Sequence, residues 1–293
     1  MTPTSVLLLV ILRTSAGAGP GPVTLHFAWP ANLQGSVKHT YSNRSQADHP
    51  TIEGGVEYRF AVKDAPGGLH RVVPSDVRYA PPASIMAVGE PSIVLYDDRG
   101  AFKGVEHTKG DLLDRMTDGP LPLPPEKKAE IRAQIEALQQ SEGREKWDEL
   151  TGRWNGITLA PGKPVKRTVK LGLGSILGRT EVDAVETTTF ETEVACDAAA
   201  LEKTCVRLEL ETVPAKALPR KPDPFGMIEI SVTKRVIIVL EPGTLVPYSI
   251  HTERADLVER EARDDPKGKP TQTERYLQLD DLAFSYAPGA RKL

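Results

Sequence analysis

The chain has 293 residues, of which 39% are apolar and 26% are charged, and its formal net charge at pH 7 is −3. This composition is ordinary for a soluble globular protein, and the length suits one large domain or two ordinary ones. A chain with a slight excess of acidic residues gives no electrostatic case for binding a phosphate backbone, so nucleic acid is not expected among its partners.

The N-terminus has the pattern of a secretory signal peptide over residues 1–18. Residues 6–12 (VLLLVIL) form a compact apolar run, and residues 16–18 (AGA) fit an A-x-A cleavage site. The run is far shorter than the roughly 20 residues that span a bilayer, and no later segment is long enough, so no transmembrane segment is expected. We therefore expect an exported protein, periplasmic or extracellular. The alternative is a buried first strand, because no Lys or Arg precedes the run and Arg13 ends it.

Residues 19–107 are predicted to form the N-terminal half of a β structure. In residues 56–62, apolar and charged residues alternate with the period of two that buries one face of a strand. Residues 93–96 and 101–105 are also strand-like, and the sequence DDRG between them predicts a hairpin turn. A similar strand, acidic turn and strand recurs at residues 236–252, so two related β halves are one organisation that the sequence suggests.

Residues 108–152 are predicted to form a helical insert. Pro125 favours a helix start and Gly143 favours its end, and a second short helix is predicted over residues 144–150. The apolar face of the first helix consists of Ile131, Ile135 and Leu138.

Two tryptophans occur in the sequence WDELTGRWNG, at the end of this insert. Trp147 and Trp154 are predicted to pack the insert onto the sheet. The alternative is an aromatic rim at the mouth of a ligand site, because an indole has an apolar body and one polar N–H group.

Residues 153–293 are predicted to form the C-terminal β half, in one domain with the N-terminal half. Residues 227–240 begin with alternating apolar and polar side chains and end apolar on both faces, which is typical of a central strand. Near the C-terminus, the apolar positions change phase at Asp280 and Asp281, which predicts a β-bulge because one extra residue reverses the facing of a strand.

Cys196 and Cys205 are nine positions apart, in a short insert between two strand-like segments. A close, even pair in an exported protein predicts a disulfide bond. The alternative is two free thiols, and a metal site has less support because no histidine lies near them in the sequence.

The sequence contains no motif for catalysis or for a cofactor. It lacks a G-x-S-x-G nucleophile elbow, its six histidines lack metal-ligand spacing, and residues 172–178 depart from the dinucleotide fingerprint. His39 and His251 fall in strand-like segments and are expected at the surface. We therefore expect no catalytic residue, no metal and no cofactor, and a protein that is not an enzyme.

These patterns predict a mainly β fold, with a large antiparallel curved sheet or half-barrel and the helical insert around residues 108–152. This layout resembles the half-barrel of periplasmic lipoprotein carriers, the LolA-like proteins. It also resembles secreted bacterial β proteins that carry a tryptophan-rich segment before an L-x-P-G-K-P-V stretch, here residues 159–165 (LAPGKPV).

A curved antiparallel sheet, partly closed by helices, would hold an apolar ligand or a lipid on its concave face, so we expect a binding protein. The alternative is a structural or protein-interaction component of the cell envelope, with contacts to other envelope proteins through residues 214–224 and 259–269. The first function requires a continuous cavity, whereas the second is compatible with a filled core. An enzyme of unrecognised type ranks third.

Overall fold

The computed structural model describes residues 21–45, 51–81, 90–106, 124–173, 180–197, 202, 204–220, 227–260 and 272–286. The predicted signal peptide, residues 1–18, lies outside the described residues, as do residues 108–123 of the predicted insert. Parts of the two segments expected to contact partners also lie outside them, at residues 221–224 and 261–269.

Apart from a small separate pair, the described strands form one open antiparallel sheet of 11 strands, which confirms the predicted fold class. Their order across the sheet is β6-β5-β4-β3-β2-β13-β12-β11-β10-β9-β8. Because β2 pairs with β13, the strands that precede the helix and those that follow it share one continuous sheet. The strands are β2 (Gln34–Ser45), β3 (Ile52–Ala65), β4 (Leu69–Tyr79), β5 (Ile93–Asp97), β6 (Phe102–Glu106), β8 (Val165–Leu173), β9 (Thr180–Val194), β10 (Cys205–Pro214), β11 (Met227–Leu240), β12 (Pro247–Arg260) and β13 (Gln272–Tyr286).

The predicted hairpin between β5 and β6 is confirmed, and its turn chemistry explains it. The Asp97 carboxylate accepts hydrogen bonds from the backbone N–H groups of Arg99 and Ala101. Gly100 has a φ of 75°, which favours glycine, and a Cβ at this position would lie 2.5 Å from the Phe27 ring.

In the described part of the insert, residues 124–152, the two predicted helices form one continuous helical segment. Helix α3 (Pro125–Trp147) begins at Pro125, as predicted, and continues into the π-helical turn η2 (Asp148–Gly152). Gly143 lies inside α3, so its prediction as a helix end is wrong. A Cβ on Gly143 would come within 2.5 Å of the Val105 side chain on β6, so this glycine allows the helix to approach the sheet closely.

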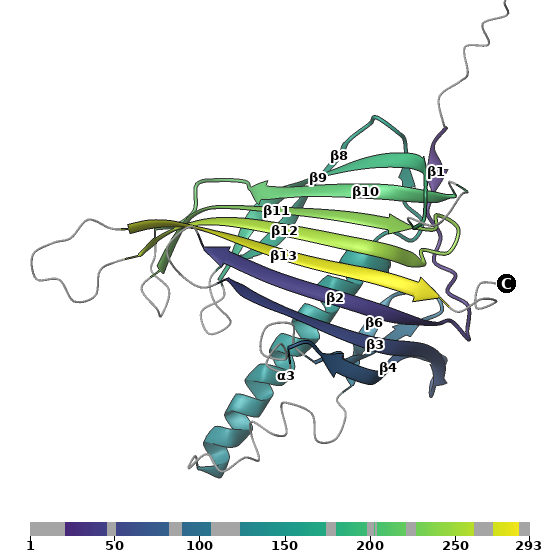
Figure 1. Cartoon of the computed structure of the whole chain (residues 1–293), viewed down its shortest axis with the longest axis horizontal. Helices are drawn as coiled ribbons and strands as arrows, with labels where there is room; N and C mark the ends of the chain where they lie inside the picture. Colours follow the sequence, from purple (N-terminus) through teal and green to yellow (C-terminus); the bar gives the residue numbers. More distant parts are fainter. Residues whose placement is uncertain are drawn as a thin grey trace, which may run out of the picture.

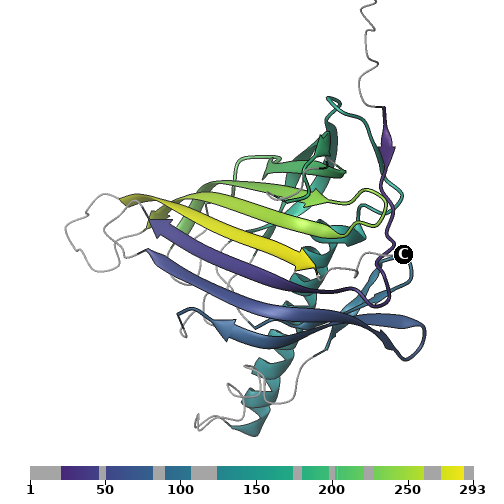
Figure 2. The same ribbon diagram turned by 45° about the vertical axis from the view of Figure 1, so that its right-hand side comes forward.

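The sheet bends around the helix. In Figure 1, α3 crosses behind the strands, and Figure 2 shows the same arrangement after a 45° turn. We call the face that holds the helix the concave face and the opposite face the outer face. The curvature is strong, because the Arg254 side chain on β12 donates a hydrogen bond to the Gly172 carbonyl on β8, four strands away in the sheet.

An apolar core fills one half of the concave face, near the β11–β12 hairpin. One cluster of buried residues includes Leu33, Phe60 and Trp147, and a second includes Leu25 and Trp154. Leu25 and Leu33 belong to the segment before β2, which also supplies strand β1 (Val23–Thr24) to a small pair with β7 (Thr158–Leu159). The chain's own N-terminal segment therefore packs into the face that the sequence suggested for a ligand.

The predicted bulge at Asp280 and Asp281 is wrong, because β13 keeps its register with β12 and β2 through both residues. Asp280 faces the concave side and Asp281 the outer side. The phase of the sequence changes because the concave face becomes polar here, while Leu277 and Leu279 lie half-buried on the outer face.

Candidate functional site

Beyond the two core clusters, the middle of the concave face is polar, and a third buried apolar cluster (Leu171, Leu173, Ala184 and Val232) lies next to it on β8, β9 and β11. On neighbouring strands, apolar concave residues such as Val37, Leu282 and Ile250 give way to charged and hydrogen-bonding ones. We call these residues the polar belt; they are His39, Tyr41, Lys234, Arg254, Asp256, Gln278 and Asp280. All of them are half-buried, so their charges and dipoles need partners within the protein.

Arg254 is the most connected member of the polar belt. Its Nε donates to both Asp256 carboxylate oxygens, at 3.0 and 2.9 Å, and its Nη2 donates to Glu229 Oε1 at 3.0 Å. Its Nη1 donates to the Gly172 carbonyl at 3.1 Å. One guanidinium group therefore ties β8, β11 and β12 together, because its planar fork has donors on every side.

Polar contacts hold the end of the helical segment over the belt. Lys234 on β11 pairs with Glu149 in η2, and its Nζ lies 3.6 Å from Glu145 Oε1 in α3. On the neighbouring part of the belt, Asp280 Oδ1 lies 3.0 Å from His39 Nε2, and Asp280 Oδ2 accepts a hydrogen bond of 2.9 Å from Gln278. Through Lys234, the belt therefore holds the end of the helical segment against the sheet.

The carboxylates of the belt are perturbed in opposite directions. Burial raises the pKa of Asp256 above its usual value, against the lowering effect of Arg254. Burial also acts to raise the pKa of Asp280, but the hydrogen bonds from His39 and Gln278 outweigh it and hold that pKa below its usual value.

A pair of carboxylates with opposite shifts is typical of acid–base catalysis, but the spacing here does not suit it. Asp280 is opposite Thr252 on β12, four residues from Asp256. At about 3.4 Å per residue, the two groups are roughly 14 Å apart along the strand, more than the span of about 5–9.5 Å that glycosidase carboxylates use. Both side chains are also engaged in hydrogen bonds.

Trp147 and Trp154 are both buried, with exposed fractions of 4% and 3%. The Trp147 indole stacks on Tyr96 and donates a 2.7 Å hydrogen bond to the Gly100 carbonyl, which joins α3 to the β5–β6 turn. The Trp154 indole donates a 2.7 Å hydrogen bond to the Glu149 carbonyl. Both side chains pack within the core clusters that the helical segment and the sheet share.

A charged layer covers the Trp154 ring. The guanidinium carbons of Arg153 and Arg167 lie 4.7 and 5.5 Å from the centre of the ring. Both arginines bind the buried Glu186 on β9, Arg153 through Nη1 at 3.2 Å and Arg167 through Nε at 2.8 Å. Burial lowers the pKa of Arg153, and its Nε and Nη2 are shielded from solvent without a protein partner. This layer closes the core towards β8 and β9.

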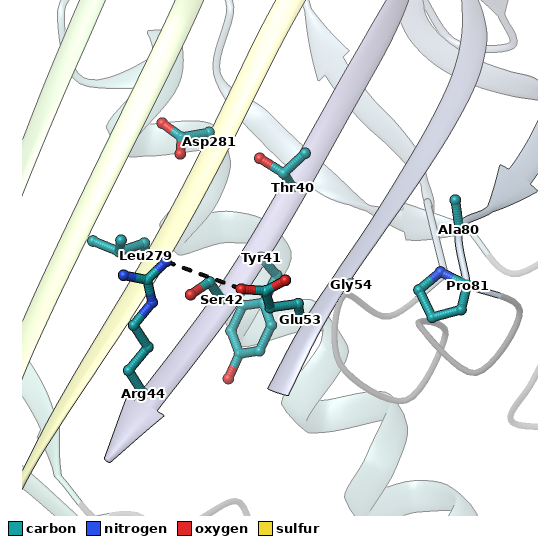
Figure 3. A pocket seen from close by; sticks show the side chains of 10 residues that line it. All are labelled: Thr40, Tyr41, Ser42, Arg44, Glu53, Gly54, Ala80, Pro81, Leu279 and Asp281. Carbon is teal, nitrogen blue, oxygen red and sulfur yellow. Dashed lines mark ion pairs between the residues drawn. The ribbon is translucent and has the colours of Figure 1, made fainter. Parts of the chain in front are cut away.

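Two shallow hollows lie on the outer face, where β2, β3, β12 and β13 are neighbours. The first has a volume of about 400 Å³ and the second about 310 Å³, and they share Thr40 and Asp281. Figure 3 shows the residues that line the first hollow, including Gly54, and the ion pair between Arg44 on β2 and Glu53 on β3. The first hollow is lined by both polar and apolar groups and the second mainly by apolar ones, and both are open to solvent and not enclosed cavities.

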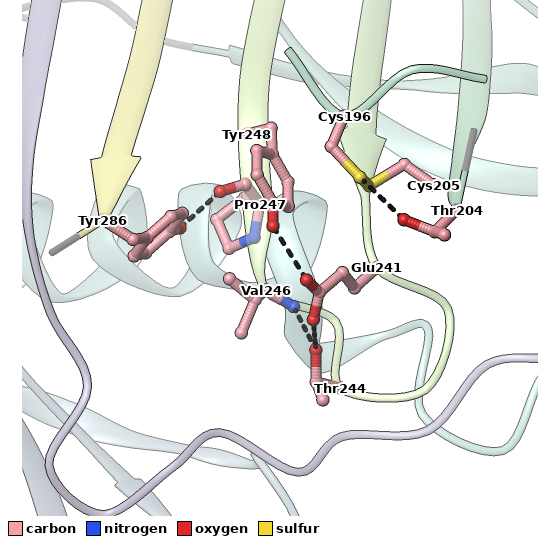
Figure 4. The surroundings of a disulfide bond; sticks show 9 residues. All are labelled: Cys196, Thr204, Cys205, Glu241, Thr244, Val246, Pro247, Tyr248 and Tyr286. Atoms are coloured by element: carbon pink, nitrogen blue, oxygen red, sulfur yellow. Dashed lines mark hydrogen bonds between the residues drawn. A yellow bond between two sulfur atoms is a disulfide. The ribbon is translucent and has the colours of Figure 1, made fainter. Parts of the chain in front are cut away.

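The predicted disulfide bond between Cys196 and Cys205 is present. It lies beside the β11–β12 hairpin (Figure 4), where Glu241 accepts hydrogen bonds from Thr244 and from the Tyr248 hydroxyl. Both cysteines are buried in the first core cluster. The bond therefore fixes the β9–β10 connection against the apolar half of the sheet, far along the strands from the polar belt.

The prediction of two surface histidines is wrong for His39, whose side chain is only 13% exposed and pairs with Asp280 in the belt. His251 is partly exposed and pairs with Asp281 on the outer face, at 2.6 Å. The belt itself was missed. The sequence alone carries no signal for it, because the polar stretches of β2, β12 and β13 have the same pattern whether they face solvent or the interior, and only the strand pairing separates the two.

Among the described residues, no group of three His, Cys, Asp or Glu side chains is arranged to hold a metal ion. Within the same part of the chain, no helix is both long and apolar enough to cross a membrane.

No protein-family model and no curated protein sequence matches this chain. Among solved structures, it is similar to a lipovitellin chain from a structure on lipid–protein interactions in lipovitellin, with a TM-score of 0.37 and 11% sequence identity. The match covers 90% of this chain and 26% of the lipovitellin chain, so this chain spans about a quarter of that protein. A likeness at this level carries no statement about function.

Proposed function

We propose that the protein is an exported, non-enzymatic interaction component of the cell envelope or the extracellular space. The observation that carries this proposal is that the described chain fills its own concave face. Leu25, Leu33, Trp147 and Trp154 occupy the apolar half, and ion pairs neutralise the polar belt. Recognition then falls to the outer face and to the edges of the sheet.

Export is supported by the disulfide bond, because such bonds persist in oxidising compartments. The absence of enzymatic activity is supported by the wide separation of Asp256 and Asp280 and by the partners that hold each of them. A catalytic acid and base would need to reach the same substrate atoms.

A second candidate function is the binding of an apolar ligand or lipid. The observation that favours it is the open, curved sheet with a helix across its concave face (Figure 2). The segment with Leu25 and Leu33 packs where such a ligand would lie, so it would have to move for the ligand to enter.

Native mass spectrometry of the chain, purified after export in a bacterial host, distinguishes the two candidates. We expect a bare mass, less two hydrogens for the disulfide bond. Extra mass that passes into organic solvent as lipid would refute the proposed interaction role in favour of the carrier. A mass that includes residues 1–18 in the exported protein would refute their removal as a signal peptide.

A further inference from the structure

The stretch LAPGKPV, residues 159–165, forms the turn that leads into the edge strand β8. The Lys163 N–H donates to the Ala160 carbonyl, and Gly162 has a φ of 70°, as expected for a type II turn with Pro161 before the glycine. Pro164 then precedes the strand without a backbone N–H group. This suits the start of an edge strand, where the missing N–H group would not be needed by a neighbouring strand.

The direction of the β8 backbone follows from two hydrogen bonds. The Asp183 carbonyl on β9 accepts from the Ala215 N–H, next to β10, so the backbone polar groups of Asp183 point away from β8. Lys170 is opposite Asp183, and its N–H and C=O groups therefore point away from β9, towards the free edge. The Gly172 carbonyl points the same way, since it accepts from Arg254.

Alternation along the strand gives Lys166 and Thr168 the same orientation as Lys170. No described residue pairs with the backbone of these three residues. At the other edge of the sheet, strand β6, a side chain from α3 pairs with the backbone. There, the Gln140 side chain both donates to and accepts from the Val105 backbone on β6, at 2.7 and 2.9 Å.

The side chains along β8 are basic. Residues 163–170 (KPVKRTVK) contain four cations and no acid, in a chain whose net charge is −3. Arg167 pairs with Glu186, which it shares with Arg153, and Lys170 pairs with Asp183. Among the described residues, no carboxylate pairs with Lys163 or Lys166. Val165, at the start of the strand, is 45% exposed and offers an apolar contact.

We propose that the β8 edge binds an extended acidic segment of a protein partner, which adds a strand to the sheet. The backbone of Lys166, Thr168 and Lys170 would supply the main-chain hydrogen bonds, and Lys163 and Lys166 the selection for acidic residues. Lysines on an edge strand discourage pairing with another basic edge, including that of a second copy, so the complementary partner is acidic. This inference rests on the proposed interaction function and assigns the β8 edge as the surface that binds the partner.

The test mixes the full exported chain with a capped seven-residue peptide of alternating Glu and Val. Amide hydrogen exchange of the chain is then measured with and without the peptide. We expect the peptide to slow exchange at Lys166, Thr168 and Lys170. Lys166→Glu should weaken binding about fivefold, since it replaces an attraction with a repulsion. Lys127→Glu, on an exposed part of α3, changes the net charge equally and should weaken binding less than twofold.

Thr168→Pro removes an outward N–H group and should abolish binding while the melting temperature is kept. Lys166→Glu keeps the proposal testable if the proline variant fails to fold. Unchanged exchange on β8, equal binding of a peptide with Lys in place of Glu, or protection confined to the outer-face hollows would each overturn the β8 assignment. The last result would leave the interaction function intact, whereas retained lipid in the mass spectrum would remove that function itself.

Discussion

Replacing Gln140 tests how the edge of the sheet is held by the helix. Its side-chain amide makes two hydrogen bonds with the backbone of Val105, which is 7% exposed. A net contribution of about 1 kcal/mol for each bond gives roughly 2 kcal/mol for Gln140→Ala. Alanine is the better helix former by a few tenths of a kcal/mol, which lowers the expected loss to about 1.5 kcal/mol.

Urea denaturation would measure this loss, and hydrogen exchange would show whether it begins at β6. Gln134→Ala is the matched control, because Gln134 is exposed on the same helix and its amide makes only a 3.4 Å contact with Glu130. Its free energy of unfolding should change by less than about 0.5 kcal/mol. Equal effects of the two substitutions would refute the idea that Gln140 caps the edge strand.

Three further predictions concern the core, the disulfide bond and the polar belt. Trp154→Ala should lower the free energy of unfolding by about 3–5 kcal/mol, since it empties a buried site; a loss below about 1 kcal/mol in urea denaturation would contradict its place in the core. Replacing Cys196 and Cys205 by Ser should cost about 2.7 kcal/mol by chain entropy for a loop of about ten residues, and an unchanged urea midpoint would count against a formed bond. The folded-state pKa of Asp280 is below its usual value, so its stabilisation is complete above the unfolded-state pKa, near 3.9, and is lost as the pH falls through the folded-state pKa. Asp280→Asn should therefore flatten the fall of stability below about pH 4, measured by thermal melts against pH, and an acid limb as steep as that of the wild type would argue against this role.

Local patterns predicted most of the strands because each repeats a two-residue period or a turn signal. The DDRG turn and the run at residues 227–240 needed no tertiary information. The pairing of β2 with β13 could not be predicted in this way, since it joins segments more than 200 residues apart in the sequence. The prediction of a helix end at Gly143 was wrong for a related reason. A glycine is needed there because Val105, on a strand distant in the sequence, packs against the helix at this position.

The candidate site was less predictable than the fold, because polar residues on a strand have the same pattern whether they face solvent or a polar interior. Asp280 and Asp281 are adjacent in the sequence and lie on opposite faces of β13, one in the belt and one beside a hollow. Each has a histidine partner on a different neighbouring strand, His39 on β2 and His251 on β12. Only the order of the strands reveals which acid is interior.

The same reasoning explains why the concave face is a weak place to expect a partner and an edge is a stronger one. A buried charge requires an internal partner whether or not a ligand is present, and Arg254, Lys234 and Asp280 each have one. Backbone groups on an edge strand remain solvated without any partner, so the protein is stable before binding and can exchange water for a new strand. The open β8 edge and the capped β6 edge therefore differ in what they can offer a second protein.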